Sequence, residues 1–236
     1  MRILIASSPK TGNVWLKYLL MFIYNIQEAQ PRNSSLDNMG WLGSIESFVS
    51  VQHWNPTKKV LDWVKENDVI VCTTTRHPGD EFVSLYYYVN RMYPLWDQSG
   101  WPRPRKEMPS AVMIGEEIDS PTTLKFLKEG FGKHITKSVE WLLTGKSHIV
   151  QYEALKDAPL QTLYNLCQSI EPAAIGTIKR AIEQSTIEKQ RGRGNHLRIH
   201  CRSGEKNQWK TELSDVHIEI FKELYSKELS CLGYAF

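Results

Sequence analysis

Apolar runs alternate with amphipathic segments along the chain, and the first such pair lies at the N-terminus. Residues 2–6, RILIA, form a short and almost wholly apolar run, which predicts a buried strand. Apolar residues then recur every three or four positions from Val14 to Ile26, as in a helix that covers a sheet. The chain therefore begins with a predicted strand, a loop at 7–13 and a helix.

The same alternation continues beyond this first pair. Further elements are expected as strands at 68–75 and 147–152 and as helices at 58–66, 78–92, 157–170 and 214–229. Pro78, Asp157 and Ser214 stand where three of these helices begin, and such residues favour helix starts. Alternating strands and helices predict an α/β fold with a central parallel sheet flanked by helices.

Two long stretches interrupt this alternation. Residues 93–121 are rich in proline, tryptophan and charge, and residues 191–210 are rich in glycine and basic side chains. Long irregular segments of a compact domain are usually functional, so we expect both stretches to act as lids. No internal repeat and no linker is visible, which predicts a single domain over residues 1–236.

Composition and charge narrow the class of protein only slightly. The chain has 236 residues, of which 41% are hydrophobic, and this is typical of a globular protein. A formal net charge of +3 is too small to predict nucleic acid or a membrane as a partner. The four cysteines are far apart, and the first apolar run is too short for a signal peptide or a membrane span. We therefore expect a reduced, cytoplasmic protein.

The loop SSPKTGN, between the first strand and its helix, is the first candidate site. Such a loop lies at the carboxyl edge of a parallel sheet, where backbone N–H groups and the helix N-terminus can bind an anion. The Lys-Thr pair of a Walker A motif is present as Lys10 and Thr11, but Leu4 and Pro9 occupy the two glycine positions of that motif. The loop alone is therefore consistent with either an anion site or an exposed turn that carries a lysine.

Two later segments carry further anion-binding candidates. Arg76 ends the strand at 68–75, and Ser84 lies just over one turn into the next helix, so the two can share an oxyanion. Alternatively, Arg76 pairs with Asp80 and Ser84 bonds its own helix backbone. In RSGEKNQWK (202–210), basic residues surround Gly204, which fits either an anion-binding strip or a solvated basic loop.

Taken together and in this order, the three segments resemble the PAPS-dependent sulfotransferases, which transfer a sulfuryl group from 3′-phosphoadenosine 5′-phosphosulfate (PAPS). PKTGNVW resembles the family's Pro-Lys-Ser-Gly-Thr-Thr-Trp loop, RHPGDEFVS its arginine and serine spaced eight apart, and RSGEKNQWK its Arg-Lys-Gly-x-x-Gly-x-Trp-Lys motif. QYEALKDAP and GKHITKSVEWLL are similar to two further family segments. The resemblance covers nearly the whole chain and implies a P-loop-like three-layer sandwich.

The resemblance also implies which residues contact the donor. Those for the 5′-phosphosulfate and the adenine are Lys10, Thr11, Gly12, Asn13, Val14, Trp15 and Tyr152, and those for the 3′-phosphate are Arg76, Ser84, Arg202, Ser203 and Gly204. The product is adenosine 3′,5′-bisphosphate (PAP), and no metal is expected. Val14 cannot supply the hydroxyl of the family's threonine, and Asn207 replaces the second glycine of the C-terminal motif, which we expect to restrict that loop.

The catalytic base implied by the resemblance is His53, which precedes Arg76 at about the family's spacing. An imidazole can take a proton from the acceptor as that group attacks sulfur. Lys10 is expected to stabilise the leaving oxygen. Val51 and Gln52 stand where the family has Lys-Thr, so the family's second catalytic lysine is missing.

The expected acceptor is a hydroxyl or an amino group of a small molecule. The short chain and the unusual context of His53 resemble bacterial enzymes that modify specialised metabolites. Candidate acceptor contacts are Trp54, Tyr87, Tyr88 and Trp96.

Two other functions stay open on the sequence alone. The first is a metal-dependent nucleotide or small-molecule kinase, which magnesium dependence would reveal, and the second is a catalytically silent module that binds the donor. His196 and His200 have the spacing of a metal pair, but without a third ligand we interpret them as part of a polar lid surface.

Overall fold

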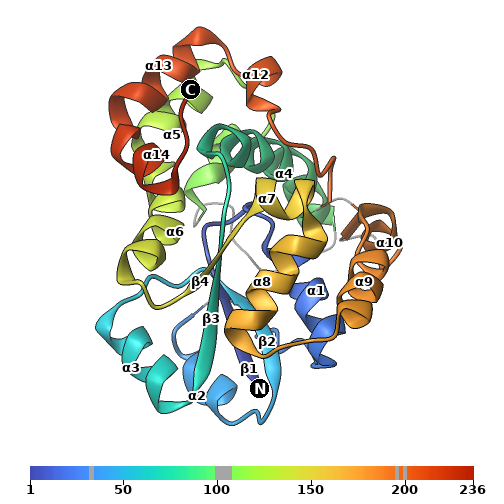
Figure 1. Ribbon diagram of the computed structural model, residues 1–236. Coiled ribbons are helices and arrows are strands. Elements are labelled where there is room, and N and C mark those ends of the chain that lie inside the picture. The colour runs from blue at the N-terminus through green and yellow to red at the C-terminus, as the bar shows by residue number, and fades with distance from the viewer. Residues whose placement is uncertain (32–34, 99–107, 195–196, 199–200) are drawn as a thin grey trace. The chain divides into compact units, whose positions relative to one another are not determined.

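The computed structural model describes residues 1–31, 35–98, 108–194, 197–198 and 201–236; of residues 93–98 only the backbone is described. Figure 1 traces the chain through its helices and strands. The chain forms two compact units. The first comprises Met1–Arg76 and Thr136–Thr186, and the second His77–Ile135 and Ile187–Phe236.

The first unit contains a parallel sheet of four strands in the order β2-β1-β3-β4. The strands are β1 (Arg2–Ala6), β2 (Phe48–Gln52), β3 (Val69–Thr75) and β4 (His148–Gln151). Because β2 and β3 flank β1 on opposite sides, the loop after β1 lies where the strand order reverses. In open α/β sheets this point is the usual place of a ligand.

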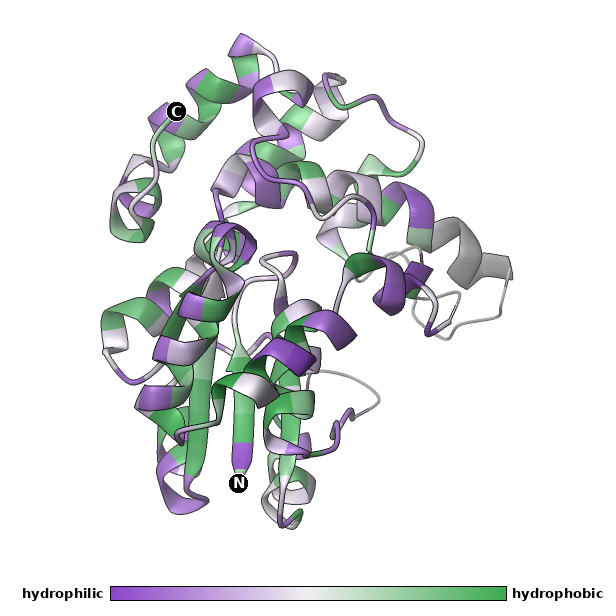
Figure 2. Ribbon diagram, turned by 45° about the vertical axis from the view of Figure 1, so that its right-hand side comes forward, coloured by the Kyte–Doolittle hydropathy of each residue, from purple (hydrophilic) through white to green (hydrophobic). Residues whose placement is uncertain are grey.

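Helices cover both faces of this sheet. They are α1 (Asn13–Tyr24), α2 (Asn38–Gly43), α3 (Lys58–Glu66), α7 (Tyr152–Asp157), α8 (Pro159–Ile170), α9 (Ile175–Gln184) and, from Thr136 onward, α6 (Gly132–Thr144). Ile3 and Ile5 of β1 lie in an apolar core with α1, α8 and α9, whereas Leu4 and Ala6 lie in another with α2, α3 and α6. Successive strand residues point to opposite faces, so RILIA serves both cores, and the strands are mostly green in Figure 2. The predicted α/β fold with a parallel sheet between helices is confirmed.

The second unit is helical. Its elements are α4 (Pro78–Gln98), the 3₁₀ helix η2 (Pro109–Met113), α5 (Pro121–Glu129), α10 (Ile187–Arg191), α12 (Trp209–Glu212), α13 (Asp215–Leu224) and α14 (Ser226–Leu232). Its core is aromatic: the ring of Phe131 meets Phe82 and Phe221 edge to face, with centroids 5.4 and 5.8 Å apart. Such pairs stabilise a core beyond the area that they bury.

Most predicted elements are present, with three differences. Strand β2 was not predicted, since its FVSVQ sequence carries the buried polar residues Ser50 and Gln52. Asp157 does not begin a helix: it ends α7, and Ala158 is the N-cap of α8. The last predicted helix is two helices, which meet at Tyr225, although Ser214 caps the first as predicted.

All four cysteines are free thiols, in agreement with the absence of a predicted disulfide framework. Burial raises the pKa of the Cys72 thiol to about 12, so this cysteine acts as a small apolar core residue. No helix in the described part of the chain has the length and apolar character needed to cross a membrane. The single-domain prediction and the lid function of 93–121 and 191–210 stay predictions.

Candidate active site

The loop after β1 has the backbone conformation of an anion-binding turn. Lys10 and Gly12 adopt positive φ angles of 71° and 100°, whereas Thr11 between them does not. Such an alternation turns successive backbone N–H groups toward one side, which creates a concavity for an anion. Gly12 is also the N-cap of α1, so the partial positive charge of that helix end faces the same region.

Tyr152 closes one side of this loop. A Cβ atom on Gly12 would lie 2.7 Å from Tyr152 Cδ2, so only glycine fits there. The ring of Trp15 meets the ring of Tyr152 edge to face, with centroids 5.9 Å apart. The first motif and the QYEALKDAP segment are therefore in direct contact, and the structure brings together three of the predicted donor residues.

Arg76 reaches the same loop from the end of β3. Its side chain is buried, Nη1 donates to the carbonyl oxygen of Lys10 at 3.3 Å, and the guanidinium carbon lies 4.5 Å from the centre of the Tyr152 ring. Planar guanidinium groups are well suited to bind phosphate. The structure thus places the arginine of the second motif beside the lysine of the first.

His53 follows directly after β2, next to the loop. Its Nδ1 lies 2.8 Å from the carbonyl oxygen of Ser7. Because a carbonyl oxygen can only accept, Nδ1 carries the proton and Nε2 keeps a lone pair. This is the tautomer that a general base needs, and the pairing of Ala6 with Gln52 in the sheet brings His53 beside Ser7.

Trp54 occupies a different environment from the other predicted site residues of the first unit. Its side chain is only 3% exposed, its ring meets Trp63 edge to face, and its carbonyl oxygen accepts a hydrogen bond from Trp141 Nε1 at 2.8 Å. Trp54 therefore belongs to the core between the sheet and α3 and α6, and its contact with an acceptor stays a prediction.

In the second unit, the C-terminal motif is anchored to the helix that carries the second motif. The Asp80 carboxylate, in the first turn of α4, accepts hydrogen bonds from the backbone N–H groups of Asn207 at 2.7 Å and of Trp209 at 3.0 Å. Asn207 has a φ of 61°, a left-handed conformation that asparagine tolerates. Asn207 therefore adopts a conformation that glycine also adopts readily.

Arg202 lies against the same helix, α4. Its guanidinium carbon is 4.1 Å from the centre of the Tyr87 ring, one helical turn after the half-buried Ser84. Tyr87 donates to Glu212 at 2.7 Å, and this hydrogen bond, followed by burial, raises the pKa of Tyr87. The structure therefore places Arg202 against the helix that carries Ser84, and the binding of a 3′-phosphate by these two residues stays a prediction.

The other predicted residues of this unit are placed as follows. The Ser203 hydroxyl accepts from Gln208 Nε2 at 2.7 Å, and Gly204 has a φ of 68°. Tyr88 is half-buried on α4. The side chain of Trp96 lies outside the described part of the structure.

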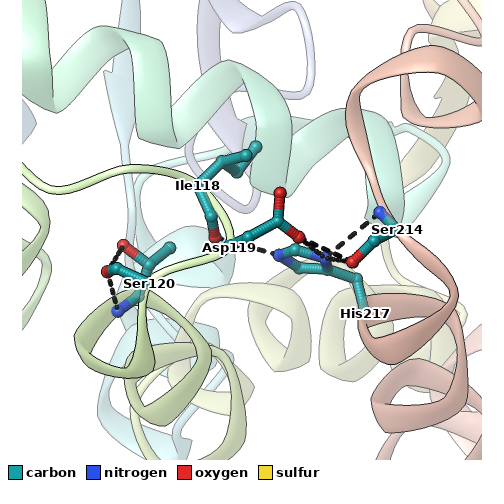
Figure 3. Close-up of polar contacts among 6 residues, drawn as sticks. Ile118, Asp119, Ser120, Ser214 and His217 are labelled. Carbon is teal, nitrogen blue, oxygen red and sulfur yellow. Dashed lines mark hydrogen bonds and ion pairs between the residues drawn. The ribbon is translucent and has the colours of Figure 1, made fainter.

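His217 forms a polar cluster that combines the residue types of a catalytic triad (Figure 3). Its Nε2 donates to the Ile118 carbonyl oxygen at 3.1 Å, so Nδ1 is the acceptor nitrogen. The Ser214 hydroxyl, at 3.0 Å, and an Asp119 carboxylate oxygen, at 3.4 Å, both face this one Nδ1 atom. A triad needs the serine and the carboxylate on opposite nitrogens, so this cluster caps α13 and is not a nucleophilic site.

The described residues contain no group of three or more histidine, cysteine or acidic side chains that could hold a metal. His196 and His200 lie outside these residues.

A P-loop-like parallel sheet with a basic loop at its switch point defines a class of α/β proteins that bind anionic donors. A model of the sulfotransferase domain matches residues 1–233, and the chain belongs to this family of enzymes, which use PAPS as the sulfuryl donor. A comparison with curated protein sequences finds no match.

Solved structures show the same fold. Mouse sulfotransferase SULT7A1 complexed with PAP has a TM-score of 0.74 and 15% identity, over 98% of this chain and 87% of that chain. Retinol dehydratase has a TM-score of 0.67 and 12% identity (97% and 81% covered) in its complex with androsterone and inactive cofactor PAP. The complex of retinol dehydratase with retinol and PAP has a TM-score of 0.64 and 12% identity, over 97% of this chain and 82% of that chain.

The family and fold predictions are thus confirmed, whereas sequence reasoning missed the buried groups that hold the loop. The Thr74 hydroxyl bonds Thr11 and Asn13, and Ser8 N–H donates to the Ser138 hydroxyl on α6 at 2.8 Å. The run of three threonines before Arg76 was the signal for part of this network.

Proposed function

We propose that this protein transfers the sulfuryl group of PAPS to a hydroxyl or amino group of a small molecule, with His53 as the base. The observation that carries this proposal is the hydrogen bond from His53 Nδ1 to the Ser7 carbonyl oxygen, at 2.8 Å. It leaves Nε2 as the acceptor nitrogen, at the end of β2 and beside the anion-binding loop.

The loop fits the 5′ end of the donor. Backbone N–H groups of Thr11, Gly12 and Asn13 bind the 5′-phosphate, and the absence of a Cβ at Gly12 lets the backbone approach it closely. Trp15 and Tyr152 contact the adenine. Val14 lies at this helix start without a polar side chain, so backbone groups supply the contacts there.

Arg76 supplies the first contact to the 3′-phosphate, a group that distinguishes PAPS from ATP. Ser84 and the segment Arg202, Ser203 and Gly204 supply the others. Support for these roles comes from the motif pattern and from the contacts of Arg202 with the Ser84 helix.

The reaction is an in-line displacement at sulfur. The acceptor oxygen or nitrogen forms the new bond to sulfur, and the bond from sulfur to the bridging oxygen of the donor breaks. His53 Nε2 takes the acceptor proton, and the Lys10 ammonium stabilises the negative charge that develops on the bridging oxygen. Val51 stands at the position of the family's second catalytic lysine and is partly buried in the core with α1, so either Lys10 acts without that lysine or another cation replaces it.

The fold relatives and the aromatic residues near the motifs support the proposed acceptor class. The retinol dehydratase structures contain androsterone or retinol, which are small apolar molecules. Trp54, Tyr87, Tyr88 and Trp96 stay the candidate acceptor contacts, and a cytoplasmic specialised metabolite is the proposed acceptor.

The test compares His53→Ala with His148→Ala, a half-buried histidine at the sheet edge that serves as the matched control. PAP formation from PAPS is measured with 2-naphthol, a hydroxysteroid and an aryl amine as acceptors. We expect the rate to fall by about 10² to 10⁴ in His53→Ala and to stay unchanged in the control. PAP affinity should change less than about twofold in both variants, because a base acts on the acceptor.

Full activity of His53→Ala would place the base elsewhere. Selective PAP binding by the wild type without PAP formation from any acceptor would favour the silent binding module. Turnover only with ATP and magnesium would establish the kinase.

A further inference from the structure

Thr74 uses every one of its polar atoms to hold the donor-binding loop and the elements around it. Its N–H donates to the Ser7 hydroxyl at 2.8 Å, and its carbonyl oxygen accepts from the Ser138 hydroxyl at 3.0 Å. Its own hydroxyl lies 2.7 Å from the Thr11 hydroxyl and donates to Asn13 Oδ1. Thr74 is buried, so these groups are shielded from water and depend on one another.

The hydrogen bonds have a defined direction through this network. Asn13 Oδ1 can only accept, so the Thr74 hydroxyl is the donor, and Asn13 Nδ2 in turn donates to the Ser8 carbonyl oxygen at 2.9 Å. Asn13 is the first residue of α1, and Ser8 begins the turn that leads to Lys10. The Asn13 amide therefore ties the two ends of the loop to each other, and the Thr74 hydroxyl holds that amide and the Thr11 hydroxyl against β3.

The side chain of Asn13 is turned into this network, since both of its polar atoms have partners within the protein. The family's threonine at this position is replaced in this chain, and the buried amide serves the loop instead of a ligand. The loop thus depends on Thr74 for its shape, while its backbone N–H groups face the anion.

Thr74 also connects the loop with the arginine of the second motif. Arg76 lies two residues further along the chain, directly after β3, and donates a hydrogen bond to the carbonyl oxygen of Lys10. A shift of the loop relative to β3 would therefore change both phosphate contacts at once.

We propose that Thr74 is a positioning residue, which holds the loop in its anion-binding conformation without contacting the donor. This inference rests on the proposed function, because it takes the loop to bind the 5′-phosphate. It predicts that loss of the Thr74 hydroxyl lowers the affinity for every ligand with a 5′-phosphate, whether or not the ligand also carries a 3′-phosphate.

The strand provides a matched control in Thr73. This residue is equally buried, and its hydroxyl donates to the Ala6 carbonyl oxygen at 2.8 Å, within the sheet. Thr73→Val therefore removes a buried hydroxyl of the same type from the same strand without a direct contact to the loop.

The experiment compares Thr74→Val, Thr74→Ser and Thr73→Val in the full-length protein. Hydrogen exchange of the amides at 8–15 is measured without ligand, and the affinities for PAP and AMP are measured by calorimetry. In Thr74→Val we expect faster exchange at 8–15 and a loss of roughly tenfold in the affinity for both nucleotides. Thr74→Ser keeps the hydroxyl and should stay within about twofold of the wild type, as should Thr73→Val.

Unchanged exchange and affinity in Thr74→Val, or equal losses in Thr73→Val, would overturn the inference. If Thr74→Val does not fold, Thr74→Cys replaces it, because a thiol is a weaker donor of similar size, and it should give a smaller change in the same direction. A wild type that binds no PAP would contradict the proposed function, and the exchange data on the ligand-free protein would then decide the role of Thr74 by themselves.

Discussion

Arg76→Ala should separate the two phosphates of the donor. The guanidinium is buried beside the loop, with Tyr152 against its face and the Lys10 carbonyl oxygen 3.3 Å from Nη1. That hydrogen bond is long, so a phosphate oxygen offers Arg76 a stronger partner than the carbonyl does. The variant removes this contact and leaves the backbone N–H groups of the loop in place.

The size of the effect follows from the type of bond. A hydrogen bond between charged groups contributes about 1.5 to 3 kcal/mol, so a bidentate contact to phosphate is worth about 3 to 6 kcal/mol. This corresponds to a loss of about 10² to 10⁴ in PAP affinity. AMP lacks the 3′-phosphate and loses only the support that Arg76 gives to Tyr152 and, through a long hydrogen bond, to the Lys10 carbonyl oxygen, about 0.5 to 2 kcal/mol, or less than about thirtyfold.

Calorimetric titration of both nucleotides measures the difference directly. Arg180→Ala, on the exposed surface of α9, is the matched control and should leave both affinities unchanged. Equal losses of PAP and AMP affinity in Arg76→Ala would refute the assignment of the 3′-phosphate to this arginine.

Three further predictions address the loop, the C-terminal motif and the helix cap. Gly12→Ala should lower the free energy of unfolding in urea by about 1 to 3 kcal/mol and reduce the affinity for PAP. The backbone at this position has a φ of 100°, and the alanine Cβ would collide with the Tyr152 ring. Asp80→Ala removes the acceptor of two backbone N–H groups, so amides at 207–209 should exchange faster, while exchange at 8–15 serves as the control. Burial lowers the pKa of His217, and the Ile118 carbonyl and Asp119 partly oppose this shift. The folded state therefore binds a proton at His217 less readily than the unfolded state does. Its contribution to stability should be complete above the unfolded pKa of about 6.5 and decline as the pH falls below it. His217→Gln should therefore lose less stability than the wild type between pH 7.5 and 5, and an equal loss would contradict this role.

The elements that could be predicted from the sequence are those with uniform patterns. Apart from Arg2, RILIA and the strand before Arg76 consist of apolar or β-branched residues because helices cover both faces of the sheet, and such runs are visible in a sequence. The three segments that resemble the family's phosphate-binding motifs were visible because glycine, lysine and arginine stand at fixed positions relative to predicted strand ends.

The missed features depend on contacts between segments that are distant in the sequence. Gln52 and Ser50 are polar but buried, with Gln52 Nε2 donating to the Ser50 hydroxyl at 3.0 Å, so β2 lacked an apolar pattern. The tautomer of His53 is fixed by the Ser7 backbone carbonyl, in the loop after β1. No side-chain pattern encodes that carbonyl, and only the register of β1 with β2 reveals it.

The central claim is that the loop after β1 and Arg76 bind the two phosphates of a 3′-phosphorylated adenine nucleotide. Calorimetric titration of the purified, metal-free protein with PAP, AMP and ATP tests it most directly, with ATP repeated in the presence of magnesium. We predict tight binding of PAP, much weaker binding of AMP and ATP, and no requirement for magnesium. Preferential binding of ATP with magnesium would contradict this account and leave His53 without its proposed role.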